Sequence, residues 1–406
     1  MKFRINICQI YLFIILLIML NGTLYAAEGI VALGLQLVFI LFSLYYTFYA
    51  NSRYHLNAYF KALNVLLIMF TIYGLVRFVS SEQLMVKGMN YLIIDKYYSL
   101  KITYISLLPV YPFYVFAKQG LLKENTIKFW FFIFLIVTIQ SFYYSQGQKL
   151  QNAIGNAEEF TNNLGYTFLS LIPLLVVFHK KPIIQYLGIA VLGYYIVICM
   201  KRGSIVIFVL CLIWFLYNNL KKVQKKRKWI TVVLSIVVVA SGFYLYYYMM
   251  ATSDYFQYRL MQTEEGDSSG RDRIYSTFYE ILKNEVNPFR LLFGYGTDGT
   301  LKIAGFFAHN DWIELAIDNG LLGVVIYLFY WIYFYNTWRK TRMYPQVFMA
   351  IGMVFLIYFI ATFFSMSYSC VSRWAMMVLG YYIAVYETPS LASDELLQKG
   401  KTIIQR

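Results

Sequence analysis

Long apolar segments recur along the whole chain and constrain its fold more than any other feature. Segments such as 29–50 and 229–250 are about as long as the twenty or so apolar residues that a helix needs to cross a bilayer. In lipid, every backbone N–H and C=O group must be bonded within the protein, which leaves only helices and closed barrels. A barrel alternates apolar and polar residues over segments of about ten, and this chain does not. The sequence therefore predicts an all-α fold, a polytopic transmembrane helical bundle.

Twelve segments are predicted as membrane spans. In chain order they are 7–26, 29–50, 62–80, 102–117, 129–143, 164–179, 183–200, 204–220, 229–250, 321–338, 347–366 and 374–386. The fourth, fifth and last are short, so they could be partial or re-entrant. Lys2 and Arg4 precede the first apolar run as in a signal peptide, but a second run follows at once, which favours a retained signal-anchor helix.

Composition excludes two other classes of protein. Only 14% of the residues are charged, against roughly a quarter in soluble globular domains, which excludes a soluble enzyme. Aromatic residues make up 20% of the chain, which excludes a disordered protein. The four cysteines lie in or beside apolar segments without a CxxC pair, so neither a zinc site nor a disulfide framework is predicted.

The net charge of +15 arises from Lys and Arg clusters between the apolar segments. Such clusters orient spans, because cytoplasmic loops are rich in Lys and Arg. The densest cluster, in 221–228, faces the cytoplasm if the N-terminus does, so we expect both termini inside. We interpret this cluster as a topology anchor, with lipid or partner binding as the alternative.

In this orientation one long loop, residues 251–320, lies outside the membrane. The expected regions are N-terminal transmembrane helices in 1–182, a second membrane region in 183–386 that includes the outer loop, and a cytoplasmic tail in 387–406. The outer loop is the only extramembrane segment long enough to hold structure of its own. Residues that carry chemistry are therefore sought in it and beside it.

Two cations occupy the short connection between the spans 183–200 and 204–220. Lys201 and Arg202 are held there at the outer membrane surface, and Gly203 is predicted to open the next helix. The free N–H groups and the positive dipole end of a helix start point to the same place. Together these features favour a phosphate group bound at the lipid surface. The alternative is that both side chains only reach toward lipid headgroups.

A second pair of cations, Arg271 and Arg273, precedes a segment with apolar residues at helical spacing, 274–285. The pair could bind an anion, or it could form ion pairs with the acidic residues of 264–267. Arg373, before the last span, could likewise meet an anion or anchor its helix.

The segment from Gly294 to Gly299 formally matches the GxGxxG pattern of dinucleotide sites. Such a site requires a strand before the glycines and a helix after them, within a strand–helix–strand unit. No such unit can surround this segment of the chain. We therefore predict a turn.

His309 begins the most specific pattern of the outer loop. Asn310 can cap a helix of about three turns, and Asn319–Gly320 can end it before the span 321–338. The chain has 3 histidines, and His309 is the one on the face where the outer cations gather. A neutral imidazole suits the role of base for a hydroxyl nucleophile. A purely structural role is the alternative.

This spacing resembles the O-antigen ligase and O-antigen polymerase family of bacterial membrane proteins. The resemblance lies in His309-Asn310, followed after nine residues by Gly320 and Gly323, in a long outer loop before the last spans. It extends over roughly residues 190–340. Supporting matches are Lys201-Arg202-Gly203, Ser269-Gly270-Arg271 and Phe293-Gly294-Tyr295-Gly296.

The resemblance implies that a glycan moves from undecaprenyl diphosphate to a sugar hydroxyl on the outer face of the bacterial cytoplasmic membrane, with no metal, nucleotide sugar or other cofactor. It implies that His309 takes the acceptor proton and that the reaction inverts the sugar. The residues expected to hold the diphosphate are Lys201, Arg202, Arg271 and Arg273, and those expected to support the site are Asn310, Gly320, Gly323 and Arg373.

We favour a repeat-unit polymerase for O-antigen, capsule or exopolysaccharide, because the chain lacks a further acceptor domain. One alternative is a ligase that transfers finished glycan to lipid A core or another acceptor. Another is a flippase for lipid-linked glycans, which would need charges near the middle of the membrane. Residues 145–163 depart from related polymerases, because Lys149 is their only cation where a second arginine-rich loop is expected. Besides the lipid-linked oligosaccharide, the expected partners are membrane lipids and a chain-length regulator, and no nucleic acid.

Overall fold

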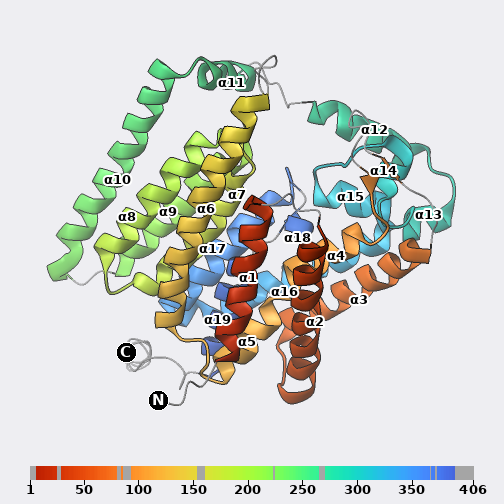
Figure 1. Ribbon diagram of the computed structural model, residues 1–406, viewed down its shortest axis with the longest axis horizontal. Coiled ribbons are helices and arrows are strands. Elements are labelled where there is room, and N and C mark those ends of the chain that lie inside the picture. Colours follow the sequence, from red (N-terminus) through yellow and green to blue (C-terminus); the bar gives the residue numbers. More distant parts are fainter. Residues whose placement is uncertain are drawn as a thin grey trace.

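Each of the twelve apolar segments is helical in the computed structural model, which confirms the predicted fold class (Figure 1). The structure describes residues 6–24, 29–79, 84–85, 93–152, 161–222, 225–264, 270–365, 367–370 and 373–388. Its elements are α1 (Ile7–Leu24), α2 (Ile30–Arg53), α3 (Ala58–Val79), β1 (Leu84–Met85), β2 (Ile93–Ile94), α4 (Tyr98–Leu107), α5 (Val110–Lys118), α6 (Glu124–Asn152), α7 (Leu164–Leu171), η2 (Ile172–Phe178), α8 (Pro182–Ile198), α9 (Arg202–Lys222), α10 (Lys225–Thr252), α11 (Asp254–Glu264), α12 (Arg271–Asn284), α13 (Pro288–Phe293), α14 (Gly299–Ala304), α15 (Asp311–Asp318), α16 (Gly320–Lys340), η3 (Thr341–Met343), α17 (Pro345–Ala361), α18 (Ser367–Cys370) and α19 (Arg373–Glu387).

The chain is an integral membrane protein by the length and composition of these helices. Within the described residues, 7 helices are long and apolar enough to cross a membrane, counting α4 and α5 together. Four shorter apolar helices accompany them: α1, α7 with η2, α8 and α17. The strands β1 and β2 form only a two-residue antiparallel pair.

Proline divides two of the predicted spans. The fourth consists of α4 and α5, which are separated at Leu108–Pro109, because proline has no backbone N–H to continue the helix. The sixth begins as α7 and continues as the 3-10 helix η2, with Pro173 in its first turn. The fifth is longer than predicted, because α6 extends over 29 residues.

The two short spans α5 and α19 pack against each other in the interior of the bundle. Residues 110–117 of α5 and 374–385 of α19 are all buried. Gly380 permits this close approach, because a Cβ there would lie 2.6 Å from the carbonyl oxygen of Val110. Small residues commonly allow such contacts between membrane helices. Since lipid touches little of either helix, neither needs a long apolar sequence.

Contacts between distant segments define the two ends of the bundle. At one end, Asn6 Nδ2 donates to the carbonyl of Leu121 (3.2 Å), and Asn57 Nδ2 donates to Glu387 (2.9 Å). The start of α1, the α2–α3 and α5–α6 connections and the end of α19 therefore lie together. The helices α11 to α15 lie at the opposite end (Figure 1). Which end faces the cytoplasm stays a prediction.

The helices α11 to α15 belong to the predicted outer loop and are called the outer helices for that reason. Three of them, α12, α14 and α15, enclose a small apolar core of their own. Its buried members are Phe278, Ala304, Ala308 and Ile317. Phe278 comes from α12, where the sequence predicted a helix. This core fixes the outer helices to one another, and they are attached to the bundle by apolar contacts, such as that of buried Leu315, and by polar contacts described below.

Candidate functional site

The short helix α15 follows His309 directly. Its cap is Asn310, as predicted, because the Asn310 Oδ1 atom accepts from the N–H groups of Trp312 (3.0 Å) and Ile313 (3.2 Å). The helix has 8 residues, or about two turns, which is shorter than the predicted three. Gly320 then begins α16, so α15 leads straight into a membrane span.

His309 has a left-handed backbone, with φ of 53°, which is uncommon for a residue with a side chain. Hydrogen bonds on both sides keep it there. Before it, the N–H of buried Ala308 donates to Glu314 Oε2 (2.7 Å), and after it lies the Asn310 cap. The side chain of His309 is exposed. The local strain thus presents the imidazole outward from a rigid support.

The residues at the end of α17 bring three helices to His309. The carbonyl of Phe363 accepts from both Asn310 Nδ2 (3.1 Å) and the hydroxyl of Tyr275 on α12 (3.2 Å). The next residue, Phe364, packs against the first turn of α9, where a Cβ on Gly203 would lie 3.4 Å from its ring. The starts of α9, α12 and α15 therefore converge beyond the end of α17.

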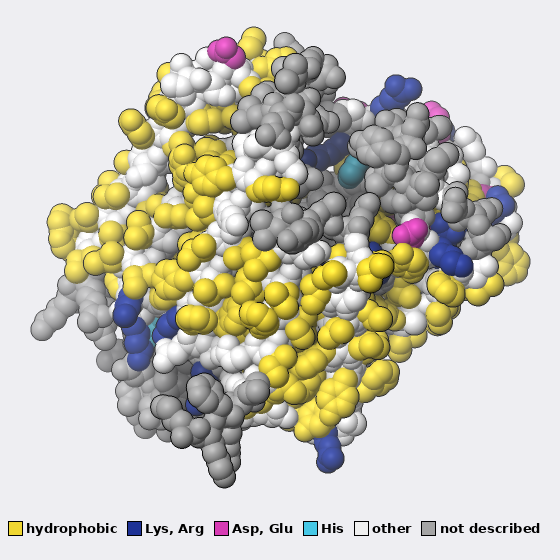
Figure 2. Space-filling model, in the orientation of Figure 1, with side chains coloured by type: hydrophobic (Ala, Val, Ile, Leu, Met, Phe, Trp, Pro, Cys, Tyr) yellow, Lys and Arg dark blue, Asp and Glu magenta, His cyan; other side chains and the backbone are white. Residues whose placement is uncertain are grey.

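This convergence places two of the predicted cations around the imidazole. The imidazole reaches solvent on one side, but the surrounding protein removes water from the rest of it, and this desolvation, followed by the positive charges of Arg271 and Lys201, lowers the pKa of His309 from its ordinary 6.5. The imidazole is therefore neutral at pH 7. Figure 2 shows a hollow at this end of the molecule in which histidine and Lys or Arg side chains gather.

The other predicted cations lie around the hollow or away from it. Arg202 is half-buried in the first turn of α9, next to Lys201. Arg273 is exposed on α12. Arg373 lies apart, since its guanidinium lies over the ring of Phe39 on α2, 5.6 Å from the ring centroid. Its Nε atom is buried and has no hydrogen-bond partner among the described residues, so this side chain is directed into the bundle.

The segment from Gly294 to Gly299 is a turn, as predicted. It is bound to the end of α15, because Tyr295 N–H donates to the carbonyl of Ile317 and Gly296 N–H to that of Asp318, both at 2.8 Å. Within the described residues around it there are only helices and turns, so the context of a dinucleotide site is missing.

Gly320 is required by close packing against this turn. Its φ is 64°, and a Cβ there would lie 2.5 Å from the nitrogen of Gly294 and 2.5 Å from the carbonyl carbon of Leu292. No side chain fits between two backbones at that separation. Gly323 is similarly enclosed, with 2.3 Å to Asn319 Cβ. Both glycines of the predicted pattern thus shape the junction between α15 and α16.

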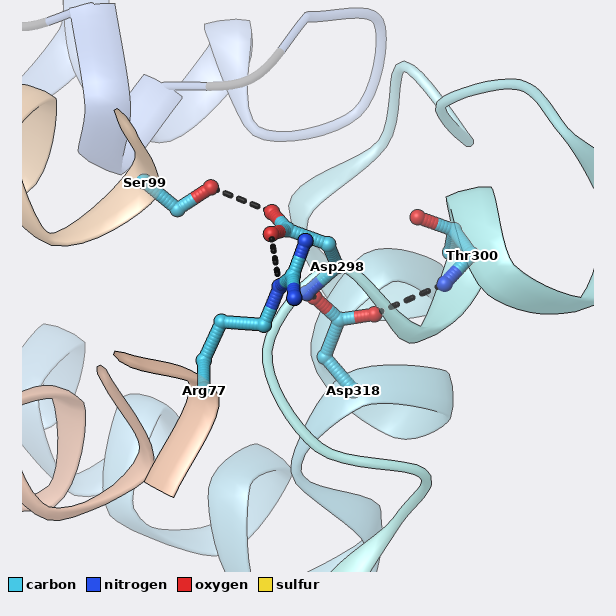
Figure 3. Close-up of polar contacts among 5 residues, drawn as sticks. All are labelled: Arg77, Ser99, Asp298, Thr300 and Asp318. Carbon is cyan, nitrogen blue, oxygen red and sulfur yellow. Dashed lines mark hydrogen bonds and ion pairs between the residues drawn. The ribbon is translucent and has the colours of Figure 1, made fainter. Parts of the chain in front are cut away.

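The sequence analysis missed a buried ion pair that attaches the outer helices to the bundle (Figure 3). Arg77, at the end of α3, donates from Nε to Asp298 Oδ2 (3.0 Å), and the hydroxyl of Ser99 on α4 donates to the other oxygen. Arg77 and Asp298 are 1% and 2% exposed. A lone arginine in the apolar span 62–80 was the available signal, because a charge within a span needs a partner.

Two further buried carboxyl groups extend these contacts to His309. Asp318 accepts from the backbone N–H groups of Asp298 and Thr300, both at 3.0 Å. The Thr300 hydroxyl donates to Glu314 Oε1 (2.6 Å), and Glu314 also holds the peptide before His309. Burial raises the pKa of Glu314 to about 7 and that of Asp318 well above its ordinary value. The position of the imidazole is thus linked to Arg77.

No group of three or more His, Cys, Asp or Glu side chains placed to hold a metal occurs in the part of the chain that the structure describes. The acidic residues 265 and 267, which were alternative partners for Arg271 and Arg273, lie outside the described residues.

Comparison with known proteins identifies a domain. Residues 187–328 match a family described as O-antigen ligase. The match runs from α8 into α16 and contains Lys201, Arg271 and His309. It confirms the resemblance that the spacing of the sequence indicated. No curated protein matches the chain.

We predict that Arg77→Ala destabilises the protein by about 3–5 kcal/mol, because removal of one partner leaves the other charge buried without compensation. The measurement is thermal unfolding of the detergent-solubilised protein. The matched control is Arg53→Ala, since Arg53 is exposed at the end of α2. In the double variant with Asp298→Ala, the loss should be smaller than the sum of the single losses. Additive losses would contradict the ion pair.

Proposed function

We propose that this chain, which carries an O-antigen ligase domain in residues 187–328, transfers a glycan from undecaprenyl diphosphate to a sugar hydroxyl. The reaction takes place at the outer face of the bacterial cytoplasmic membrane, with both termini inside the cell. The hollow around His309 is the proposed active site. Its position at the start of the span α9 suits a donor whose lipid chain remains in the bilayer.

One arrangement carries the proposal: the positive charges of Arg271 and Lys201 act on the His309 imidazole in this hollow. His309 is exposed, so an acceptor hydroxyl can reach it. Arg271 and Lys201 are close enough to lower its pKa. A base that is neutral at pH 7 accepts a proton, and neighbouring cations attract a diphosphate. The same arrangement can therefore accept the proton of the acceptor hydroxyl and bind the diphosphate of the donor lipid.

In the proposed step, an oxygen of the acceptor sugar attacks the anomeric carbon of the donor glycan while His309 takes the hydroxyl proton. The bond from that carbon to the diphosphate oxygen breaks, and its electron pair leaves with the lipid diphosphate. Attack on the opposite face inverts the anomeric carbon. Arg271 and Lys201 stabilise the charge that develops on the leaving group, so the proposed reaction needs no metal. Arg202 and Arg273 are proposed as further diphosphate contacts.

The favoured activity is that of a repeat-unit polymerase, in which the growing glycan is donor and a new lipid-linked repeat is acceptor. The alternative is a ligase with lipid A core or another acceptor, and the family description names that activity. Both use the same donor and the same chemistry at the anomeric carbon. A chain-length regulator is the proposed protein partner of the polymerase.

We predict that His309→Ala lowers glycan transfer by about a hundredfold or more, because general base catalysis typically contributes that much. The assay is transfer between lipid-linked oligosaccharides in proteoliposomes, normalised to the amount of protein. His55→Ala is the matched control, since His55 is exposed on the α2–α3 connection. Full activity of the His309 variant would remove the catalytic role.

The acidic limb of the transfer rate should have its midpoint below pH 6.5, the ordinary pKa of histidine. This direction follows from the lowered pKa of His309, because protonation of the imidazole, which stops it from acting as a base, then requires a lower pH. Replacing Arg271 with Ala should shift the acidic limb to higher pH, since a charge that lowers the pKa is removed. The measurement is the pH profile of the transfer rate for both proteins. An unchanged limb would contradict the proximity of these two side chains.

Arg271→Ala should lower transfer by about a hundredfold, a loss comparable with that of one charge-stabilising group in other active sites. Arg271→Lys should retain part of the activity, because it keeps the charge but loses the two-pronged phosphate contact. Lys283→Ala is the matched control, as an exposed cation in the last turn of the same helix, and should keep its activity. Equal activity of all three variants would place the diphosphate elsewhere.

The surface glycan of a strain without this protein distinguishes the two activities. Loss of a polymerase leaves single repeats on the final acceptor, and this is the expected result. Loss of a ligase leaves long chains on the carrier lipid, which would contradict the polymerase assignment. Gel separation of extracted glycolipids provides the measurement.

A further inference from the structure

Helix α13 is apolar and yet has no buried residue. Its side chains Phe289, Leu291, Leu292 and Phe293 are between 43% and 73% exposed, and Val286 just before it is 92% exposed. In a water-soluble loop, so many exposed large apolar groups in one short segment would be unusual, since apolar patches on protein surfaces generally mark contacts.

The helix is nevertheless held firmly in this position. Asn287 caps its start by accepting from the N–H of Phe289 (2.9 Å), and Tyr73 of α3 donates from its hydroxyl to the carbonyl of Phe293 at its end (2.7 Å). The backbones of Leu292 and Gly294 are in contact with Gly320 at the start of α16. The apolar side chains are therefore presented outward by a fixed backbone.

The exposed surface of α13 continues the apolar surface of two membrane spans. Its contacts are with the last part of α3 and the first turn of α16, both of which expose apolar side chains where a span meets lipid. These are Leu75, Val76 and Val79 on α3 and Leu321 and Val325 on α16. Figure 2 shows hydrophobic side chains extending from the bundle to the edge where Figure 1 places α13.

Cationic groups border this apolar surface. The side chain of Arg290 on α13 is 56% exposed, and its guanidinium lies 5.1 Å from the ring centroid of Tyr295. Lys96 lies over the ring of Phe78 near the end of α3, at 4.5 Å. Cations beside exposed aromatic rings are typical of the layer where lipid headgroups meet acyl chains.

We propose that α13 and Val286 insert into the outer leaflet of the membrane as an interfacial anchor for the outer helices. The occupant of the apolar surface is lipid: acyl chains contact Phe289, Leu291 and Leu292, and headgroup phosphates contact Arg290. A second copy of the chain is a less suitable occupant, because the surface runs without a break into the lipid-facing sides of α3 and α16. In this proposal the loop 251–320 contacts the bilayer through α13, in addition to its covalent connections to the spans on either side.

The test is the depth of a spin label in lipid vesicles of phosphatidylethanolamine and phosphatidylglycerol. Phe289→Cys and Val286→Cys are labelled with a nitroxide in the full-length protein, and Ser276→Cys, exposed on α12, is the matched control. Protein without an added cysteine is labelled in parallel to subtract any signal from the native cysteines. Collision with oxygen, which concentrates in lipid, is compared with collision with a water-soluble nickel chelate.

Labels at Phe289 and Val286 should collide more often with oxygen, and the label at Ser276 more often with the nickel chelate. Val286 precedes the helix, so its variant reports the depth even if the Phe289 variant fails to fold. A preference for nickel at both sites would overturn the proposal, because the surface would then face water. Spectral broadening between labels on different molecules would also overturn it, because a second copy would then cover the surface. The measurement does not depend on glycan transfer, so its outcome is separate from that of the proposed function.

Discussion

The ion pair between Arg77 and Asp298 joins the outer helices to the membrane bundle, and the position of His309 depends on it. Both charges are buried, and a buried charge without a partner costs several kcal/mol. The outer segment therefore has to dock where α3 ends. From Asp298 the hydrogen bonds continue through Asp318 and Glu314 to the peptide before His309. A contact between two residues that are 221 positions apart in the chain thus helps to place the imidazole of His309.

Among the described residues of the outer helices, four acidic groups are buried, whereas others, such as Asp272 and Glu280 on α12, are exposed. The acidic side chains exposed by 6% or less are Asp298, Asp311, Glu314 and Asp318. Burial raises the pKa of Asp311, Glu314 and Asp318, so these groups carry less negative charge than free carboxylates. Arg271 and Lys201 lie near His309. The buried acids therefore offset less of the positive charge of these two cations, and positive charge attracts phosphate groups.

Local patterns in the sequence were sufficient for the helices and for one end of the site. Apolar runs located the spans, and the Asn310 cap followed from its place before an apolar helix. Pro109 and Pro173 also indicate where the fourth and sixth spans are divided, because proline cannot continue a helix. The partner of Arg77 was not predictable. A lone arginine in a span indicates that an acidic partner exists, but the sequence does not show which distant residue it is. The spacing of the sequence singled out Gly320. The physical reason for a glycine there is the backbone of Leu292 and Gly294 beside it, and this contact forms only when the chain is folded.

The interfacial position of α13 has a consequence for the height of His309 above the membrane. Through Gly294 and Gly320, α13 is packed against the start of α16, and ten residues lie between Gly320 and His309, eight of them in α15. A helix of eight residues spans about 12 Å, so α15 separates His309 from the edge of the span by about that length. The headgroup layer adds about 5–7 Å to each side of the hydrocarbon core. Lys201 directly precedes the span that begins at Arg202, so the proposed diphosphate site lies where the headgroup of a lipid anchored in the bilayer can reach it.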